Sequence, residues 1–196
     1  MKKSRFLILA FLSVSLVFLS SCKEDPEDEV SPYIGNYIIT KATLSEPLTL
    51  QTNEFGTIEV PVGTDITPMI QGALLSSINC DPDKSIIQLL EDFAIFLSCT
   101  NTQQEVDAGT WEEQSETVIV LNLNSIAVPS TPTGIVVTVS DIVFVNNVLK
   151  GETMVPITED MLADIVQAFS QGSATLDREA TPDAVNTYFT IELTKQ

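Results

Sequence analysis

The sequence predicts a mainly β protein, either an antiparallel barrel or a barrel-like sandwich, that carries two short amphipathic helices. Short segments rich in β-branched and aromatic residues recur along the chain, separated by turns rich in proline, glycine, asparagine and aspartate. In two places the spacing of the apolar residues changes to that of one helical face. No unit of roughly 20 to 50 residues repeats, which argues against a solenoid or a propeller.

The strands expected in the first half of the domain follow from this composition. The first is expected at residues 33–40, which combine tyrosine with isoleucine and threonine. Residues 79–83 are a turn by composition, and two further strands are then expected on either side of Glu91-Asp92. The remaining strands expected here are residues 48–50, 56–60, 86–90 and 93–99.

The second half begins with Gly109-Thr110-Trp111, which opens another pair of strands that continues at residues 118–123. The longest expected strand is 135–145, and because both of its faces are largely apolar we expect it to be covered on both sides. Asn146-Asn147 predicts a hairpin turn into a strand at 148–155. Alternation then predicts the last strand at 186–194.

Two segments have helical periodicity. The first covers residues 66–78, with Thr67 as the expected N-cap and Pro68 at the first helical position, and Gly72 makes it a weak helix. The second is better defined. Thr158 is its expected N-cap, residues 161–169 provide the apolar stripe, and Gly172 ends it.

The composition restricts the chemistry and the partners that this chain can have. It carries 27 acidic and 9 basic residues, a net charge of -18, which argues against nucleic acid and anionic lipid headgroups as partners. It contains no histidine, which excludes Ser-His and Cys-His catalytic pairs and zinc sites that use imidazole. We therefore expect a protein that is not an enzyme and that carries no cofactor.

The start of the chain reads as an export signal. Three cations precede an uncharged run at residues 6–19, which fits a secretory signal peptide and is short for a transmembrane span. The segment Leu19-Ser20-Ser21-Cys22 resembles a bacterial lipobox. This resemblance implies that residues 1–21 are a lipoprotein signal peptide and that Cys22 is the lipid attachment site. The alternative is an ordinary signal peptide that leaves Cys22 as a free thiol.

Residues 22–32 are expected to form a lipidated acidic tether, because six of the seven residues from Lys23 to Glu29 are charged and such a run does not order itself. Cys22-Lys23-Glu24-Asp25 resembles the export signal of Bacteroidetes lipoproteins that reach the outer face of the outer membrane. That resemblance implies an outer-membrane, lipid-anchored protein displayed at the cell surface. If the run is only a linker, the protein stays at the periplasmic face.

Residues 33–196 are long enough for one domain with a substantial core. With Cys22 lipidated, Cys80 and Cys99 remain, and an even number in an exported chain suggests one disulfide. Two unpaired thiols in the core are the alternative, since cysteine packs well as a small apolar residue.

A set of short motifs resembles one known family. In order, they are Gly35-Asn36-Tyr37, the turn at Cys80-Asp81, a hairpin through Phe93, Cys99, and Gly109-Thr110-Trp111 before an alternating strand. This order resembles the lipocalin-like, calycin-type lipoprotein domains of Bacteroidetes, over roughly residues 33–123. The chain departs from lipocalins proper, which have Gly-x-Trp on the first strand. The resemblance implies a barrel with an interior that holds a small apolar or amphipathic ligand.

Few residues suggest catalysis or metal binding. Asp81-Pro82-Asp83 could clamp a divalent cation, but a capped turn explains it better. Glu112 and Glu113 form a carboxylate pair, but neighbouring strand residues point to opposite faces, so the pair is poorly placed to flank one bond.

Three functions follow from these observations, in decreasing order of support. The first is non-catalytic binding of a small hydrophobic ligand in the barrel. Tyr37, Phe93 and Trp111, together with Tyr33 and Phe96, are its expected lining, although small barrels are often filled by side chains. The second is a structural or interaction module that binds an outer-membrane protein partner. The third is a carboxylate-dependent hydrolase.

Overall fold

The computed structural model describes residues 30–196 except 76–77, 79, 103 and 125–133. The predicted signal peptide, the lipid attachment site Cys22 and most of the tether lie outside the described residues. Residues Tyr33–Gln196 form one compact unit of the chain.

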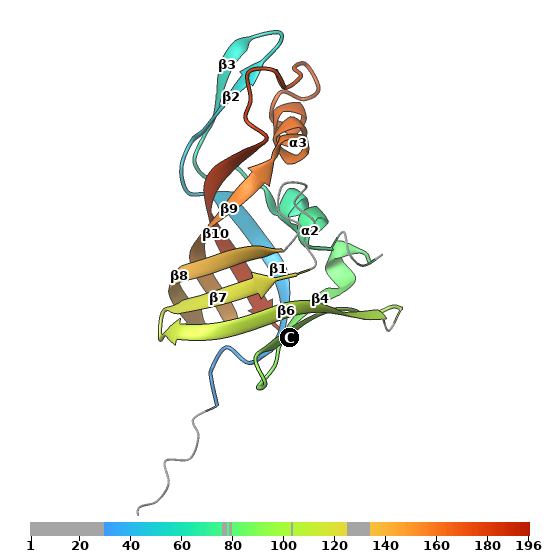
Figure 1. The fold of residues 1–196 in the computed structure, drawn as a ribbon, viewed down its shortest axis with the longest axis vertical. Coiled ribbons are helices and arrows are strands. Elements are labelled where there is room, and N and C mark those ends of the chain that lie inside the picture. Colours follow the sequence, from blue (N-terminus) through green and yellow to red (C-terminus); the bar gives the residue numbers. More distant parts are fainter. Residues whose placement is uncertain (1–29, 76–77, 79, 103, 125–133) are drawn as a thin grey trace, which may run out of the picture. The chain divides into compact units, whose positions relative to one another are not determined.

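Eight antiparallel strands form a closed barrel, which confirms the predicted class and selects the barrel over the sandwich (Figure 1). The order around the barrel is β1-β10-β9-β8-β7-β6-β5-β4, and pairing of Gly35 to Tyr37 with Ile87 to Leu89 closes the ring. The strands are β1 (Gly35–Leu44), β4 (Ser85–Leu89), β5 (Ala94–Cys99), β6 (Gln104–Ser115), β7 (Val118–Leu123), β8 (Ile135–Val145), β9 (Val148–Thr158) and β10 (Ala184–Lys195).

Alternation along each strand separates an inner from an outer row of side chains. In β10, Phe189, Ile191 and Leu193 are buried inside, as their spacing predicts. In β8 the expectation of burial on both faces is wrong, because Val136 is 65% exposed and Val143 is 57% exposed. No described element covers these outer β8 residues, so their apolar side chains lie on the surface of the described barrel.

Turn residues of the expected type close the β8–β9 hairpin. Asn146 and Asn147 both have positive φ angles, 53° and 64°, the backbone of the two-residue turn that best matches strand twist. Asparagine tolerates this conformation better than most residues other than glycine. The predicted hairpin is therefore confirmed, and β9 continues past the predicted end of the strand to Thr158.

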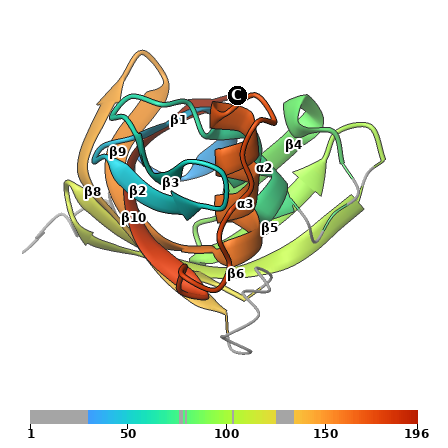
Figure 2. The same ribbon diagram turned by 90° about the horizontal axis from the view of Figure 1, so that it is seen from above.

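Helices and a hairpin lie over one end of the barrel, as Figures 1 and 2 together show. The hairpin consists of β2 (Leu48–Thr52) and β3 (Gly56–Val60), and the helices are α2 (Thr67–Leu75) and α3 (Glu159–Phe169). A single 3₁₀ turn, η2 (Pro82–Lys84), precedes β4. The predicted stripe of α3 is buried at Leu162, Ile165 and Val166, and the side chain of Thr158 caps it as expected.

The capping of α2 differs from the prediction. Asp65, two residues before the helix begins, accepts hydrogen bonds on Oδ1 from both the backbone N–H and the hydroxyl of Thr67. These hydrogen bonds lower the pKa of the Asp65 carboxyl below its usual value. The Thr67 hydroxyl instead accepts a hydrogen bond of 2.8 Å from the backbone N–H of Ala42. Thr67 therefore fastens the helix to β1 rather than capping it.

Candidate ligand cavity inside the barrel

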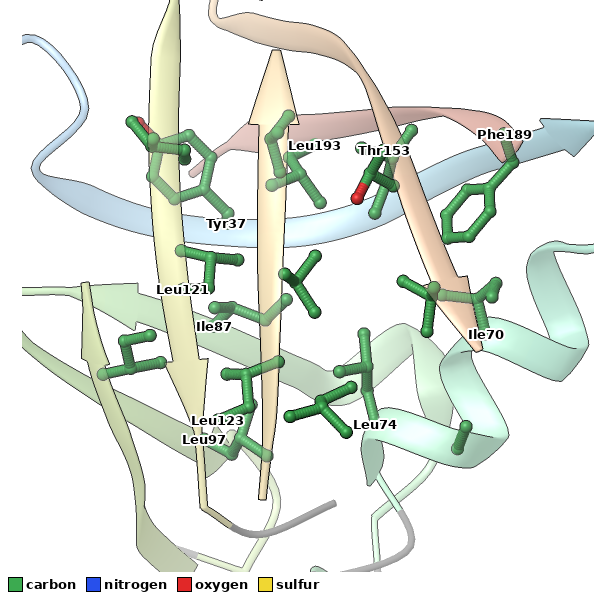
Figure 3. Close-up of a pocket in the computed structure, with 18 of the residues that line it drawn as sticks. Tyr37, Ile70, Leu74, Ile87, Leu97, Leu121, Leu123, Thr153, Phe189 and Leu193 are labelled. Atoms are coloured by element: carbon green, nitrogen blue, oxygen red, sulfur yellow. The ribbon is translucent and has the colours of Figure 1, made fainter. Parts of the chain in front are cut away.

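The interior of the barrel is not completely filled. A cavity of about 90 Å³ remains, enclosed by inner-row side chains of seven of the eight barrel strands and by residues of α2 and α3 (Figure 3). β6 is the one barrel strand that contributes nothing to this lining. Representative lining residues from around the ring are Tyr37, Leu89, Leu97, Ile119, Leu121, Val137, Val139, Ile191 and Leu193.

The described part of the lining is almost entirely aliphatic and includes no charged side chain. The hydroxyl groups among these described lining residues belong to Tyr37 and Thr153. The Tyr37 hydroxyl donates a 2.8 Å hydrogen bond to the carbonyl oxygen of Tyr33. Burial, and secondarily the neighbouring Tyr33 phenol, raises the pKa of Tyr37 to about 12, so this phenol stays neutral. The cavity therefore offers an uncharged, apolar environment throughout.

Thr153 differs from Tyr37 because its hydroxyl is not engaged. It lies on the inner row of β9, between Val139 of β8 and Phe189 of β10 in the sheet. The residue is only 5% exposed, and its Oγ1 has no hydrogen-bond partner in the described part of the chain. Figure 3 shows this oxygen turned toward the space between the lining side chains.

Helix α2 closes the cavity at the covered end of the barrel. Ile70, Ala73 and Leu74 contribute to the lining from one face of this helix. Besides the contact at Thr67, the Gln71 side chain donates a 3.0 Å hydrogen bond to the carbonyl oxygen of Ile39. Both contacts join α2 to β1, so the cover is positioned by specific polar contacts as well as by packing.

Of Tyr37, Phe93 and Trp111, which the sequence predicts in the lining, the structure places Tyr37 alone in the cavity wall. The prediction for Phe93 is wrong, because this residue lies in the β4–β5 turn with a φ of 64° and is 53% exposed. The prediction for Trp111 is wrong as well. It is buried, but its ring packs on Phe93 with centroids 5.5 Å apart, and its indole N–H donates to the carbonyl oxygen of Leu90.

The other two aromatic residues considered also lie outside the lining. Tyr33 is buried and its hydroxyl donates to the backbone oxygen of Glu116. Phe96 falls between the buried residues Ile95 and Leu97 of β5, and therefore belongs to the outer row. The lining consists mainly of aliphatic residues at alternate strand positions. Period-two alternation marks this inner row, but it gives no sign of which inner side chains leave a space.

A second, more open groove of about 550 Å³ lies between α2 and α3. Ile66 and Met69 line it from the α2 side, and Ile165, Ala168 and Phe169 line it from α3. Two carboxylates, Asp65 and Asp164, also border this groove. The Asp65 carboxylate already accepts two hydrogen bonds from Thr67 and so stabilises the start of α2.

Cys80 and Cys99 form a disulfide in the structure, with their Cα atoms 5.8 Å apart. It joins the segment after α2 to the end of β5 across 19 residues of sequence. In the chain-entropy model a loop of this size stabilises the fold by about 3 kcal/mol. The bridge therefore restrains the chain between the covering helix and the barrel wall.

The acidic motifs show no metal-binding or catalytic arrangement. Asp83 forms a 2.8 Å ion pair with Lys84, and both side chains are largely exposed. Within the described residues, no group of three or more histidine, cysteine, aspartate or glutamate side chains is arranged to hold a metal ion. Glu112 and Glu113 are both exposed on β6.

Comparison of the sequence with models of protein families finds no match, and comparison with curated proteins finds no match either. Within residues 30–196, apart from the short gaps named above, no helix is both long enough and apolar enough to cross a bilayer.

Proposed function

We propose that this protein is a non-enzymatic, lipid-anchored envelope lipoprotein whose barrel holds a small apolar or amphipathic ligand. The observation that carries the binding proposal is the enclosed cavity, with its aliphatic wall and no charged group. Moving apolar surface from water into such a site is favourable by about 0.8 kcal/mol for each buried methylene. Apolar pockets with few polar groups are the usual form of small-molecule sites.

The volume of the cavity limits the size of the ligand. A cavity needs about 10–15 Å³ to hold one water molecule, so the cavity of about 90 Å³ accommodates a compact apolar group or a short length of one hydrocarbon chain. A branched or polycyclic molecule would require the wall to move. The side chains of α2 are the part of the lining carried by a helix with a central glycine, Gly72, and this helix is the natural place for such adjustment.

Filling the cavity tests the binding proposal. Ala73→Leu adds three carbon atoms to a lining position on α2, so we expect it to occupy the space that a ligand needs. The thermal midpoint of the wild-type protein should rise with increasing concentration of 1-pentanol, because a ligand of the folded state stabilises it. In Ala73→Leu the rise should be reduced by at least half. The measurement is thermal unfolding followed by circular dichroism.

Ala168→Leu is the matched control, since it makes the same change on an exposed helical position that lines the groove between α2 and α3. This variant should respond to 1-pentanol as the wild type does. If Ala168→Leu loses the response and Ala73→Leu keeps it, the ligand binds in the groove and the barrel proposal is wrong.

The proposed location follows from the sequence of the anchor. The lipobox resemblance at Cys22 supports acylation, and the acidic run after it supports export to the cell surface. Each methylene of an acyl chain buried in a membrane contributes about 0.8 kcal/mol, so two or more chains hold a domain firmly. A barrel anchored in this way would hold its ligand close to the membrane in which the acyl chains are inserted.

The outer surface of the barrel favours a second candidate, an interaction module for an outer-membrane protein. Val143 and Val145, two residues apart near the end of β8, are both more than half exposed. Exposed apolar side chains on a barrel surface are a feature of protein contacts. Cross-linking from position 143 in intact cells distinguishes the two candidates, because only the interaction module requires capture of one defined partner.

A carboxylate-dependent hydrolase has less support. The described residues of the barrel cavity wall include no carboxylate. The groove between the helices has two, but Asp65 is engaged by Thr67 and its pKa is lowered, which suits a charged cap rather than a proton donor.

A further inference from the structure

The fold satisfies most of its buried hydroxyl groups within the chain. The Thr52 hydroxyl donates to the Gly56 carbonyl oxygen at 2.9 Å, and that of Ser85 to the Asp81 carbonyl oxygen at 2.9 Å. The Thr187 hydroxyl donates to the Val185 carbonyl oxygen at 3.2 Å. The hydroxyl of Thr153 is equally buried but has no partner among the described residues, and it is the one that faces the cavity.

An unpaired hydroxyl in a core reduces stability, and a valine of nearly the same shape would avoid that penalty. Water is a poor partner at this position, because a buried water requires two to four polar groups. Among the described lining residues the other hydroxyl is that of Tyr37, which already uses its proton on the carbonyl oxygen of Tyr33. An organic molecule with one polar atom and an otherwise apolar surface fits the Thr153 hydroxyl better than a water molecule does.

We propose that the ligand of the barrel is a neutral amphiphile whose single oxygen function, a hydroxyl or a carbonyl, hydrogen-bonds to Thr153 Oγ1 while its hydrocarbon part contacts the aliphatic wall. This inference rests on the proposed function and narrows it to a chemical class. Fatty alcohols, aldehydes and esters belong to that class. A threonine hydroxyl both donates and accepts, so it pairs with either kind of oxygen.

Charged amphiphiles are excluded by the same wall. No lysine, arginine, aspartate or glutamate of the described chain lines the cavity, so a carboxylate or ammonium group would lose its hydration without gaining a counter-ion there. A fatty acid would have to enter in its protonated form. The neutral oxygen at Thr153 therefore distinguishes this site from one built around a cationic or anionic clamp.

Two probes with the same number of heavy atoms, 1-pentanol and n-hexane, test the inference. Their dissociation constants are obtained from the dependence of the thermal midpoint on probe concentration, in the wild type and in Thr153→Val. We expect the preference for 1-pentanol over n-hexane, taken as the ratio of their Kd values, to fall by about three- to tenfold in the variant. Pentanoate at pH 7 should produce no shift of the midpoint in either protein.

Thr187→Val is the matched control, because Thr187 is a buried threonine on the neighbouring strand whose hydroxyl is engaged. Without probe, Thr153→Val should raise the thermal midpoint by a few degrees and Thr187→Val should lower it. If both variants lower it equally, the Thr153 hydroxyl is already satisfied and the inference is overturned.

The binding results separate the two levels of the proposal. If both probes bind the wild type and the preference for 1-pentanol is unchanged in Thr153→Val, the barrel binds ligands but Thr153 does not select them, and only this inference fails. If neither probe binds the wild type, the proposed function itself fails.

Discussion

The Cys22→Ser variant is expected to leave the membrane fraction almost completely. Serine keeps the size of the side chain but removes the thiol that would carry the acyl chains, and without them the described residues contain no helix that could span a bilayer. A single myristoyl chain already gives only marginal membrane binding. A variant without any acyl chain should therefore bind the membrane still more weakly. The measurement is the distribution of the protein between sedimented envelopes and supernatant.

Ser21→Ala is the control for this experiment, because it keeps a small residue before Cys22 and should leave the protein in the envelope fraction. Sedimentation of Cys22→Ser in wild-type amounts would show that acyl chains are not what holds the protein. Protease treatment of intact cells tests separately whether the domain is displayed at the cell surface. Digestion of the wild-type domain is expected for outward display, and full protection would place it at the periplasmic face.

The largest loss of stability is expected from Trp111→Ala, at about 3–5 kcal/mol in the free energy of unfolding. Trp111 is 1% exposed and connects β6 to the β4–β5 turn. Its backbone N–H donates to the Phe93 carbonyl oxygen at 2.8 Å and its indole N–H to the Leu90 carbonyl oxygen at 3.0 Å. Alanine would keep the first of these contacts and lose the second, together with the packing of the ring. Urea unfolding measures the difference.

Phe93→Ala is the comparison variant, since it removes the other ring of the same contact. Phe93 is 53% exposed, so its truncation should cost much less than that of Trp111. Equal losses for the two variants would show that the contact between the rings, rather than the burial of Trp111, supports this part of the barrel.

Most of the barrel could be predicted from the sequence because its signals are local. Alternating side chains identified the inner row of β10, and the asparagine pair 146–147 identified the β8–β9 turn. The first half of β6 was missed because Gln104, Glu105 and Asp107 make it polar, and its pairing with β5 decides its structure. Strand pairing over a distance overrides such local composition.

The candidate site could be predicted only in part, because a cavity is the space that the packed side chains do not fill. Tyr37 was recognised as an inward-facing residue of the first strand. The aromatic character of Phe93 and Trp111 predicts them in the lining, but the positive φ of Phe93 places it in a turn, and Trp111 packs against Phe93. Thr153 carries no distinguishing signal in the sequence, since its importance depends on its hydroxyl having no hydrogen-bond partner among the described residues of the folded interior.

The measurement that tests the central claim most directly is methyl NMR of the full-length protein titrated with 1-pentanol. Labelled isoleucine, leucine and valine methyl groups report on both sides of the barrel wall. If the ligand occupies the interior, the methyl signals of Leu97, Ile119 and Leu121 shift in proportion to binding, while those of the exposed residues Val136 and Val143 stay in place. Shifts confined to the exposed residues, with the interior signals unchanged at saturating probe, would contradict the account.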